Sequence, residues 1–377
     1  FQSLTGKRLS VNLIPPKWEW LKQHEPDVVA KTAKLWDVHA FLTKKLTGGA
    51  VTSHGCVGPT GILDLNTMEY TQTVLDAVGL TVDMQPSLAA PGEMIGFITT
   101  QAAAEMGLHP TTPVYAGIGD GQACGIGAGI NAPGRSYLTL GTSIISGTFA
   151  PQFLTDNAFR TMVGGADSYL LETVLLSGTY TIDWYLKSLL KGTASLDELT
   201  AQAAQLPPGA EGLVLLPYWN SALNPYWDAD ARGAIIGWRG IHTQAHVFRA
   251  ILEGIAFEQR LHTEGVENAL GEEISTYIVM GGGSQSDLWC QIIADITGRT
   301  VQRSATTEAA SLGVAMLSTV EAGFYPDLIK ASESMSRVTG EPFVPDAERG
   351  KVYEQLYQDV YLPMYPALKG IMGKMGN

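Results

Sequence analysis

The spacing of apolar residues along the chain changes several times, and each change predicts a helix or a strand. Apolar side chains recur at helical spacing from Val247 to Ile255, which predicts a core helix that ends near Gly271. The same spacing predicts helices within residues 15–46, 68–77, 99–106, 181–190, 193–209 and 288–296. Apolar or β-branched runs predict strands at 94–98, 113–119, 136–148, 169–176, 212–217, 275–280 and 300–303. Residues 48–65, rich in Gly, Thr and Ser, predict an ordered loop.

The first stretch with candidate chemistry runs from residue 113 to residue 148. A short apolar strand ends there in glycines, so Asp120 is expected on a tight turn with its carboxylate exposed to a ligand. The run 121–130 predicts a helix of small residues that packs closely. Gly141 and Thr142 lie at the corner between two strands, where backbone N–H and hydroxyl groups can bind a phosphate. Both motifs also occur in turns for conformational reasons alone, so each keeps a structural alternative.

Two further glycine-containing segments precede helices. Gly178 and Thr179 open the helix at 181–190, whose N-terminus could meet a ligand. Residues 281–283 are three consecutive glycines between a strand and a helix, with Ser284 or Ser286 as the N-cap. This geometry lets a nucleotide lie against bare backbone, although close packing of the turn would require the same glycines. Because Asp120 and Gly282 each lie between a strand and a helix, we expect them on opposite walls of one cleft between two α/β domains.

Composition and charge narrow the class of protein. With 377 residues, 45% of them hydrophobic and 16% charged, the chain is long enough for two domains. A net charge of −13 argues against nucleic-acid and anionic-membrane partners, and a polyanionic substrate would need backbone amides and a divalent cation. Three widely spaced cysteines without a CxxC pair fit a reduced cytoplasm. Since no apolar run reaches about 18 residues, we expect no membrane span and a cytoplasmic location.

Two pairs of residues have the spacing of metal ligands. His242 and His246 are four residues apart and could bind zinc, but no third ligand is nearby, so a role at the start of a helix is favoured. Asp228 and Asp230 could suggest a calcium loop, but the glycine and the distal glutamate of that motif are missing, so we interpret them as turn and cap residues.

The order of these motifs resembles the FGGY carbohydrate kinases, the sugar-kinase branch of the actin and Hsp70 fold. The resemblance rests on five segments in the family's order: GIGDGQACGIGAG, SYLTLGTS, PYWNSALNPYWDADARGAIIG followed by HVFRAILEGIAF, GGGSQSDLWCQIIADITG and TTEAASLGVAML. It implies a two-domain, ribonuclease-H-like α/β fold. Residues 1–133 would be the remainder of the N-terminal domain, which carries the sugar side and the catalytic aspartate. Residues 134–345 would form the C-terminal, nucleotide-side domain, and residues 346–377 a C-terminal helix, with its return to the first domain left open.

The same resemblance assigns roles to individual residues. Asp120 would be the general base that takes the proton of a sugar hydroxyl as it attacks the γ-phosphate of ATP, and Gln122 would bind a sugar hydroxyl. The remaining assignments concern the nucleotide: Gly141 and Thr142 would contact the phosphates, Gly178 and Thr179 the ribose and phosphate side, and Gly282, Gly283 and Ser286 the adenosine. The resemblance implies ATP and Mg²⁺ as cofactors, with metal ligands unknown, because phosphoryl transfer mainly needs positioning and charge stabilisation.

The front of the chain departs from the family pattern. The family opens with an Asp-x-Gly-Thr phosphate motif and supplies much of the sugar pocket from the same region, and neither is found here, so we expect an incomplete first domain. Two hypotheses remain: a sugar kinase, or a truncated, non-catalytic remnant that binds nucleotide or a partner. For the kinase we expect a ketopentose such as D-xylulose, phosphorylated to its 5-phosphate, with another ketose, a polyol or glycerol as alternatives. A homodimer is left open.

Overall fold

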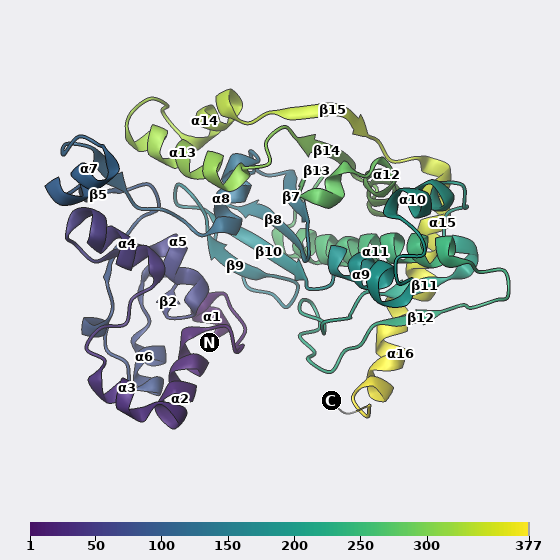
Figure 1. Cartoon of the computed structure of the whole chain (residues 1–377), viewed down its shortest axis with the longest axis horizontal. Coiled ribbons are helices and arrows are strands. Elements are labelled where there is room, and N and C mark those ends of the chain that lie inside the picture. The colour runs from purple at the N-terminus through teal and green to yellow at the C-terminus, as the bar shows by residue number, and fades with distance from the viewer. Residues whose placement is uncertain (376–377) are drawn as a thin grey trace.

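A seven-stranded sheet organises the larger, C-terminal part of the chain (Figure 1). The structure, a computed structural model, describes residues 1–375. The strand order is β15-β14-β13-β7-β8-β10-β9, with β7 parallel to β13 and β13 parallel to β14. The other neighbouring pairs are antiparallel. The strands are β7 (Arg135–Leu140), β8 (Ile144–Ala150), β9 (Arg160–Val163), β10 (Tyr169–Leu175), β13 (Thr276–Met280), β14 (Thr300–Ser304) and β15 (Val338–Phe343).

Side chains alternate between the two faces of this sheet, as the period of a strand requires. Tyr137 and Leu170 pack under α8 (Asp120–Gly127), whereas Leu138 and Leu171 belong to the core around α11 (Gln244–Leu270). The remaining elements of this part are α9 (Thr179–Trp184), the π-helical η3 (Tyr185–Leu189), α10 (Leu196–Ala204), η4 (Ala210–Gly212), β11 (Val214–Leu216), β12 (Ala234–Ile236), η5 (Gly282–Gln285), α12 (Asp287–Thr297), α13 (Ala309–Glu321) and α14 (Leu328–Met335).

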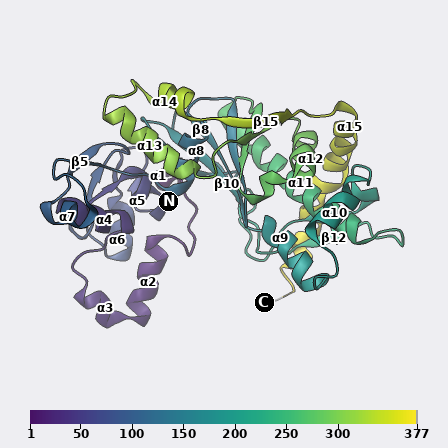
Figure 2. The same ribbon diagram turned by 45° about the horizontal axis from the view of Figure 1, so that its top comes forward.

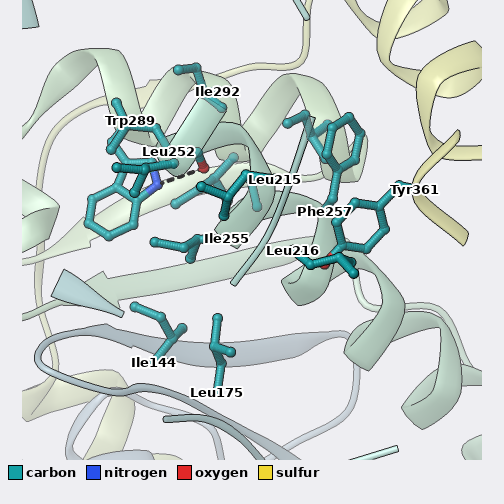
Figure 3. Packing of buried hydrophobic residues seen from close by; sticks show 14 of the residues in the cluster. Ile144, Leu175, Leu215, Leu216, Leu252, Ile255, Phe257, Trp289, Ile292 and Tyr361 are labelled. Carbon is teal, nitrogen blue, oxygen red and sulfur yellow. Dashed lines mark hydrogen bonds between the residues drawn. The ribbon is translucent and has the colours of Figure 1, made fainter. Parts of the chain in front are cut away.

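The core of this part lies between the sheet and the helices α11 and α12 (Figure 3). Ile144 and Leu175 project from the sheet toward Leu252 and Ile255 of α11. Trp289 of α12 packs beside them, and its indole N–H donates to the Leu252 carbonyl at 3.3 Å. The buried indole is therefore both packed and hydrogen-bonded, as a buried tryptophan requires.

Residues 1–115 form a smaller part beside the sheet, purple to blue in Figure 1, whose strands form three two-stranded sheets. The paired strands are β1 (Val51–Ser53) with β4 (Ser87–Ala89), β2 (Leu63–Asp64) with β3 (Glu69–Tyr70), and β5 (Met94–Phe97) with β6 (Pro113–Tyr115). The helices are α1 (Gln2–Thr5), α2 (Ile14–His24), α3 (Pro26–Lys31), α4 (Val38–Thr47), α5 (His54–Val57), η1 (Gly58–Thr60), α6 (Gln72–Val78), η2 (Val82–Met84) and α7 (Thr100–Met106).

The helices α8 and α13 lie side by side between the two parts (Figure 1, Figure 2). They cross where both are glycine. A Cβ on Gly127 would lie 2.0 Å from the carbonyl oxygen of Ala309, and a Cβ on Gly313 would lie 2.0 Å from that of Ala123. Only glycine allows two helix backbones to approach this closely.

Most predicted elements are present, with several differences. The helix predicted at 68–77 begins only at Gln72, because residues 69–70 form β3. Residues 48–65, predicted as a loop, contain β1, α5, η1 and β2. The helix predicted at 181–190 consists of α9 and the π-helical η3. The C-terminal segment comprises α15 (Ala347–Leu356), the π-helical η6 (Tyr357–Tyr361) and α16 (Leu362–Met372), and it packs on α11 of the second part, where Phe257 contacts three of its tyrosines.

Candidate active site

A cavity of about 760 Å³ lies where the carboxyl end of β7 meets α9, α10, α11 and the start of α12. It has the size of a typical small-molecule site. Six of the seven residues predicted to bind nucleotide line it, namely Gly141, Thr142, Thr179, Gly282, Gly283 and Ser286. The structure thus brings together residues that are up to 145 positions apart in the sequence.

The seventh residue, Gly178, lies directly behind this wall. Its N–H donates to the carbonyl of Thr142 at 2.9 Å, and the N–H of Thr179 donates to the carbonyl of Gly141 at 2.8 Å. A Cβ on Gly178 would lie 2.7 Å from the Gly141 oxygen. Gly178 therefore holds the start of α9 against the corner between β7 and β8, and it supports the cavity without lining it.

The three consecutive glycines 281–283 allow close packing of the turn and also leave open backbone at the cavity. Gly281 has a φ of 85°, and a Cβ there would lie 2.9 Å from the Leu140 carbonyl; a Cβ on Gly283 would lie 2.5 Å from the Trp289 ring. Close packing therefore requires glycine at these two positions. A Cβ on Gly282 would meet no atom within 4 Å, so its backbone is open toward the cavity. Ser286 is the N-cap of α12 and accepts from the Trp289 N–H at 3.3 Å, whereas Ser284 donates to the Gly281 carbonyl.

Asp120 is exposed, as predicted, but it is the first residue of α8 rather than part of a preceding turn. Gly119 has an extended backbone and acts as the N-cap, which lets the helix begin at the aspartate. The Gly121 N–H donates to one carboxylate oxygen of Asp120 at 2.8 Å. Asp120 does not line the 760 Å³ cavity, so the two groups of predicted residues occupy separate places on the molecule.

Gln122 lies on the buried side of α8, with 2% of its surface exposed. Its amide N–H donates to the Gly55 carbonyl at 2.9 Å and links α8 to α5. Its side-chain oxygen folds back toward Gly119. Contact with a sugar would require this arrangement to open.

A polar cluster beneath the start of α8 was not found from the sequence. Glu172 of β10, almost fully buried, accepts from the Arg160 guanidinium of β9 at 2.5 Å. A Cβ on Gly121 would lie 3.4 Å from the other Glu172 oxygen and 3.3 Å from the Tyr137 hydroxyl. Burial tends to lower the pKa of Arg160, but the charges of Glu172 and, more weakly, Asp120 outweigh it and raise that pKa. Arg160 and Glu172 face each other across two strands, a relationship that sequence spacing does not show.

The segment that leads into α8 is held by a second group that the sequence did not indicate. The Gly117 N–H donates to Nε2 of His39 on α4 at 2.8 Å. Burial lowers the pKa of His39, although the charge of Asp37 opposes this effect. No motif marks this lone histidine in the sequence.

The metal-ligand alternatives have structural explanations. His246 accepts from the Thr243 N–H at 3.1 Å at the start of α11, which confirms the predicted role at a helix start. Asp228 accepts from the Asp230 N–H at 2.8 Å, as in a turn. Among residues 1–375, no group of three or more His, Cys, Asp or Glu side chains is placed to hold a metal ion.

The chain matches one protein family over most of its length. Residues 1–127 match the N-terminal domain of the FGGY family of carbohydrate kinases, and residues 136–322 match the C-terminal domain of that family. The chain belongs to the FGGY family of carbohydrate kinases. It is 30% identical to a xylulose kinase of Bacillus subtilis over 374 residues, which cover 98% of this chain and 74% of that protein.

Two other proteins show the range of similarity within the family. A xylulose kinase structure from Rhodospirillum rubrum superimposes with a TM-score of 0.91 at 26% identity, covering 99% of this chain and 75% of that one. An autoinducer-2 kinase of Klebsiella pneumoniae is 27% identical over 95% of this chain and 70% of its own length.

These similarities confirm the predicted family and the sugar-kinase type of ribonuclease-H-like fold. The protein is an ATP-using, xylulokinase-like carbohydrate kinase, and its small-molecule partners are a sugar and ATP. Within the described part of the chain, no helix is long and apolar enough to cross a membrane.

Proposed function

We propose that this kinase phosphorylates a ketopentose, converting D-xylulose to D-xylulose 5-phosphate, with Asp120 as the general base. The main support is that six nucleotide-site candidates from distant parts of the sequence line one cavity. An exposed aspartate begins α8, which packs on β7, the strand that leads into this cavity. The choice of sugar is supported by the 30% identity to a xylulose kinase.

The 760 Å³ cavity is the proposed ATP site, and its chemistry fits that ligand. Its apolar lining, which includes Leu186, Phe248 and Leu252, suits the adenine ring. Within residues 1–375, the hydroxyls of Thr142 and Thr179 make no hydrogen bond and can donate to phosphate oxygens. Gly141 and Gly282 add open backbone at the strand ends, where phosphates commonly bind.

The charge of the cavity supports Mg²⁺ as a further component. Asp183, Asp197 and Asp287 line the cavity, and no lysine or arginine is among its lining residues. The nearest cations are already paired with these carboxylates, Lys187 with Asp183 at 2.8 Å and Arg303 with Asp287 at 2.6 Å, so little positive charge is left for a polyphosphate. Mg²⁺ is commonly held by phosphates, waters and one or two carboxylates, and it would neutralise the charge that develops on the transferring group. We propose that the carboxylate of Asp120 accepts a hydrogen bond from a metal-bound water or from the acceptor hydroxyl.

Asp120 is suited to accept a proton from a sugar hydroxyl. Its carboxylate is exposed, and the only described donor to it is the adjacent Gly121 N–H, which leaves the second oxygen available. Phosphoryl transfer requires the nucleophile to lose its proton to a group within hydrogen-bond reach. Gln122 is buried, and its amide N–H is used by the Gly55 carbonyl, so it can bind the sugar only if its side chain moves away from Gly119.

The division of the chain is also a proposal. We place the domain boundary near residue 133 and assign residues 134–345 to the nucleotide domain and residues 346–377 to a C-terminal segment. The two family matches, which end at residue 127 and begin at residue 136, support the first boundary. A cytoplasmic location and a homodimer remain expectations.

A substrate panel tests the proposed function. ADP release is measured with ATP and Mg²⁺ against D-xylulose, other ketoses, gluconate and glycerol, and D-xylulose should give the highest kcat/KM. The choice of sugar would be refuted if the enzyme phosphorylated another compound of the panel but no ketopentose. Other polyhydroxy acceptors are the second candidate, because the chain is also similar to an autoinducer-2 kinase. ATP binding without turnover on any acceptor would favour the non-catalytic alternative.

A further inference from the structure

The backbone between β6 and α8 carries the proposed base, and it is held at few points. Ala116 pairs through its N–H with Glu93 and through its carbonyl with Gly92, both at 2.8 Å. One residue further on, the Gly117 N–H donates to Nε2 of His39 at 2.8 Å. In the described residues, His39 is the only side chain that hydrogen-bonds to residues 116–119.

This hydrogen bond fixes the protonation state of His39. Gly117 donates its N–H, so Nε2 must accept, and the single ring proton must therefore be on Nδ1. Nδ1 is buried beside the backbone of Val51, which tends to raise the pKa of His39, but it makes no hydrogen bond of good geometry among the described residues. A second proton, on Nε2, would face the Gly117 N–H donor to donor and would break the bond.

The position is also tightly packed. A Cβ on Gly117 would lie 3.2 Å from Nε2 of His39, so the ring directly abuts the backbone. On the other side of the segment, a Cβ on Gly55 would lie 2.4 Å from the side chain of Ile118. Residues 117 and 118 therefore pack between α4 and α5. A displacement of His39 would shift these residues and, with them, Gly119 and Asp120.

We propose that His39 is a positioning residue for the reaction: its neutral ring holds Gly117, and through residues 117–119 it holds Asp120 where it can accept the proton of the sugar hydroxyl. This inference rests on the proposed role of Asp120. Protonation of His39 releases Gly117, so catalysis is lost in acid for a reason separate from protonation of the base itself.

The surroundings of His39 determine where this loss occurs. Burial lowers the pKa of His39 below 6.5, and the carboxylate of Asp37, at the start of the same helix, partly opposes the effect. The neighbouring elements carry further titratable groups. Glu93 pairs through its backbone with Ala116, and Tyr115 ends β6. On α5, burial lowers the pKa of His54 and raises the pKa of Cys56 to about 11. The neutral ring therefore predominates at neutral pH and is lost as the pH falls through the lowered pKa of His39.

The test compares three variants with the wild type in pH profiles of kcat/KM for the sugar. His39→Gln can still accept from Gly117 but does not titrate, so its activity should persist to lower pH than that of the wild type. His39→Phe keeps the ring shape without an acceptor and should lose roughly 10- to 100-fold in kcat at neutral pH, with ATP affinity unchanged. His24→Gln, at an exposed histidine of α2, is the control and should match the wild type.

Amide hydrogen exchange gives a second readout that does not need a substrate. Protection of the Gly117 amide should decrease at low pH in the wild type and persist in His39→Gln. The inference is overturned if His39→Gln and wild type share the same acid limb and the same protection. If Asp120→Asn retains normal turnover, the proposed function fails; if Asp120→Asn is inactive but both His39 variants behave as wild type, only the present inference fails.

Discussion

Substitution of Gly313 by alanine should move the helix that carries Asp120. Gly313 of α13 faces the backbone of α8, and a Cβ there would lie 2.0 Å from the carbonyl oxygen of Ala123. Ordinary contact begins near 3.4 Å, so the two helices would have to separate by about 1.4 Å. The new methyl group meets backbone rather than a flexible side chain, and no rotamer change can relieve the clash.

The expected cost follows from two opposing effects. Overpacking of this kind typically costs about 1–3 kcal/mol, whereas replacing a helical glycine by alanine returns up to about 1 kcal/mol. We expect the free energy of unfolding to fall by about 1–2 kcal/mol. We expect kcat to fall roughly tenfold or more, because small misplacements of a catalytic group are costly.

Urea unfolding and steady-state kinetics on the same preparation measure both effects. Gly370→Ala is a matched control, because Gly370 lies in α16 and a Cβ there would meet no atom within 4 Å. That variant should be as stable as the wild type or slightly more stable. Wild-type stability and kcat in Gly313→Ala would refute the close crossing of α8 and α13.

Two further substitutions test the burial of Lys7 and the assignment of the 760 Å³ cavity to ATP. Lys7 is buried, and burial lowers its pKa from 10.5 to about 7, with a smaller contribution from the charge of Arg160. Above pH 7 the folded chain has therefore lost a proton from Lys7 that the unfolded chain keeps to about pH 10. Wild-type stability should therefore rise relative to Lys7→Met by about 2 kcal/mol between pH 7 and pH 9 in urea unfolding, and an unchanged difference would count against a buried Lys7. Leu252→Ala should cost about 2–5 kcal/mol and also weaken ATP binding in calorimetry, because Leu252 lines both the core and the cavity. Ile255→Ala, in the same core but not a cavity-lining residue, should cost similar stability and leave ATP affinity unchanged; equal ATP affinities in the two variants would contradict the assigned cavity.

Local patterns predicted the elements that carry the nucleotide-site candidates. The long helix α11 ends at Leu270, with Gly271 at a φ of 70° as its C-cap, close to the predicted end near Gly271. The strand, the glycine turn and the helix around Gly282 were also predicted, because each depends on neighbours in sequence. The family resemblance then related these segments to one another, which periodicity alone could not do.

Interactions between distant segments could not be predicted in this way. His39 and Gly117 are 78 positions apart. Gly117 opens the segment GIGDGQACGIGAG, but His39 lies in none of the family segments, so the sequence gives no sign that the two residues meet. Arg160 and Glu172 meet only because β9 and β10 pair in one particular register, and a shift of one residue would place the two side chains on opposite faces. The start of α8 at Asp120 likewise depended on the extended backbone of Gly119, which its residue type alone does not fix.

The most direct test of the account is the effect of Asp120→Asn on kcat and on ATP affinity, measured on the same protein with its best sugar. Asparagine keeps the size of the side chain but cannot accept the proton, so kcat should fall by roughly 10²–10⁴ while ATP affinity changes little. A weaker affinity for ATP in the presence of Mg²⁺ together with the lost rate would indicate that Asp120 also organises metal-bound water. Near-normal turnover of Asp120→Asn would contradict the assignment of Asp120 as the general base.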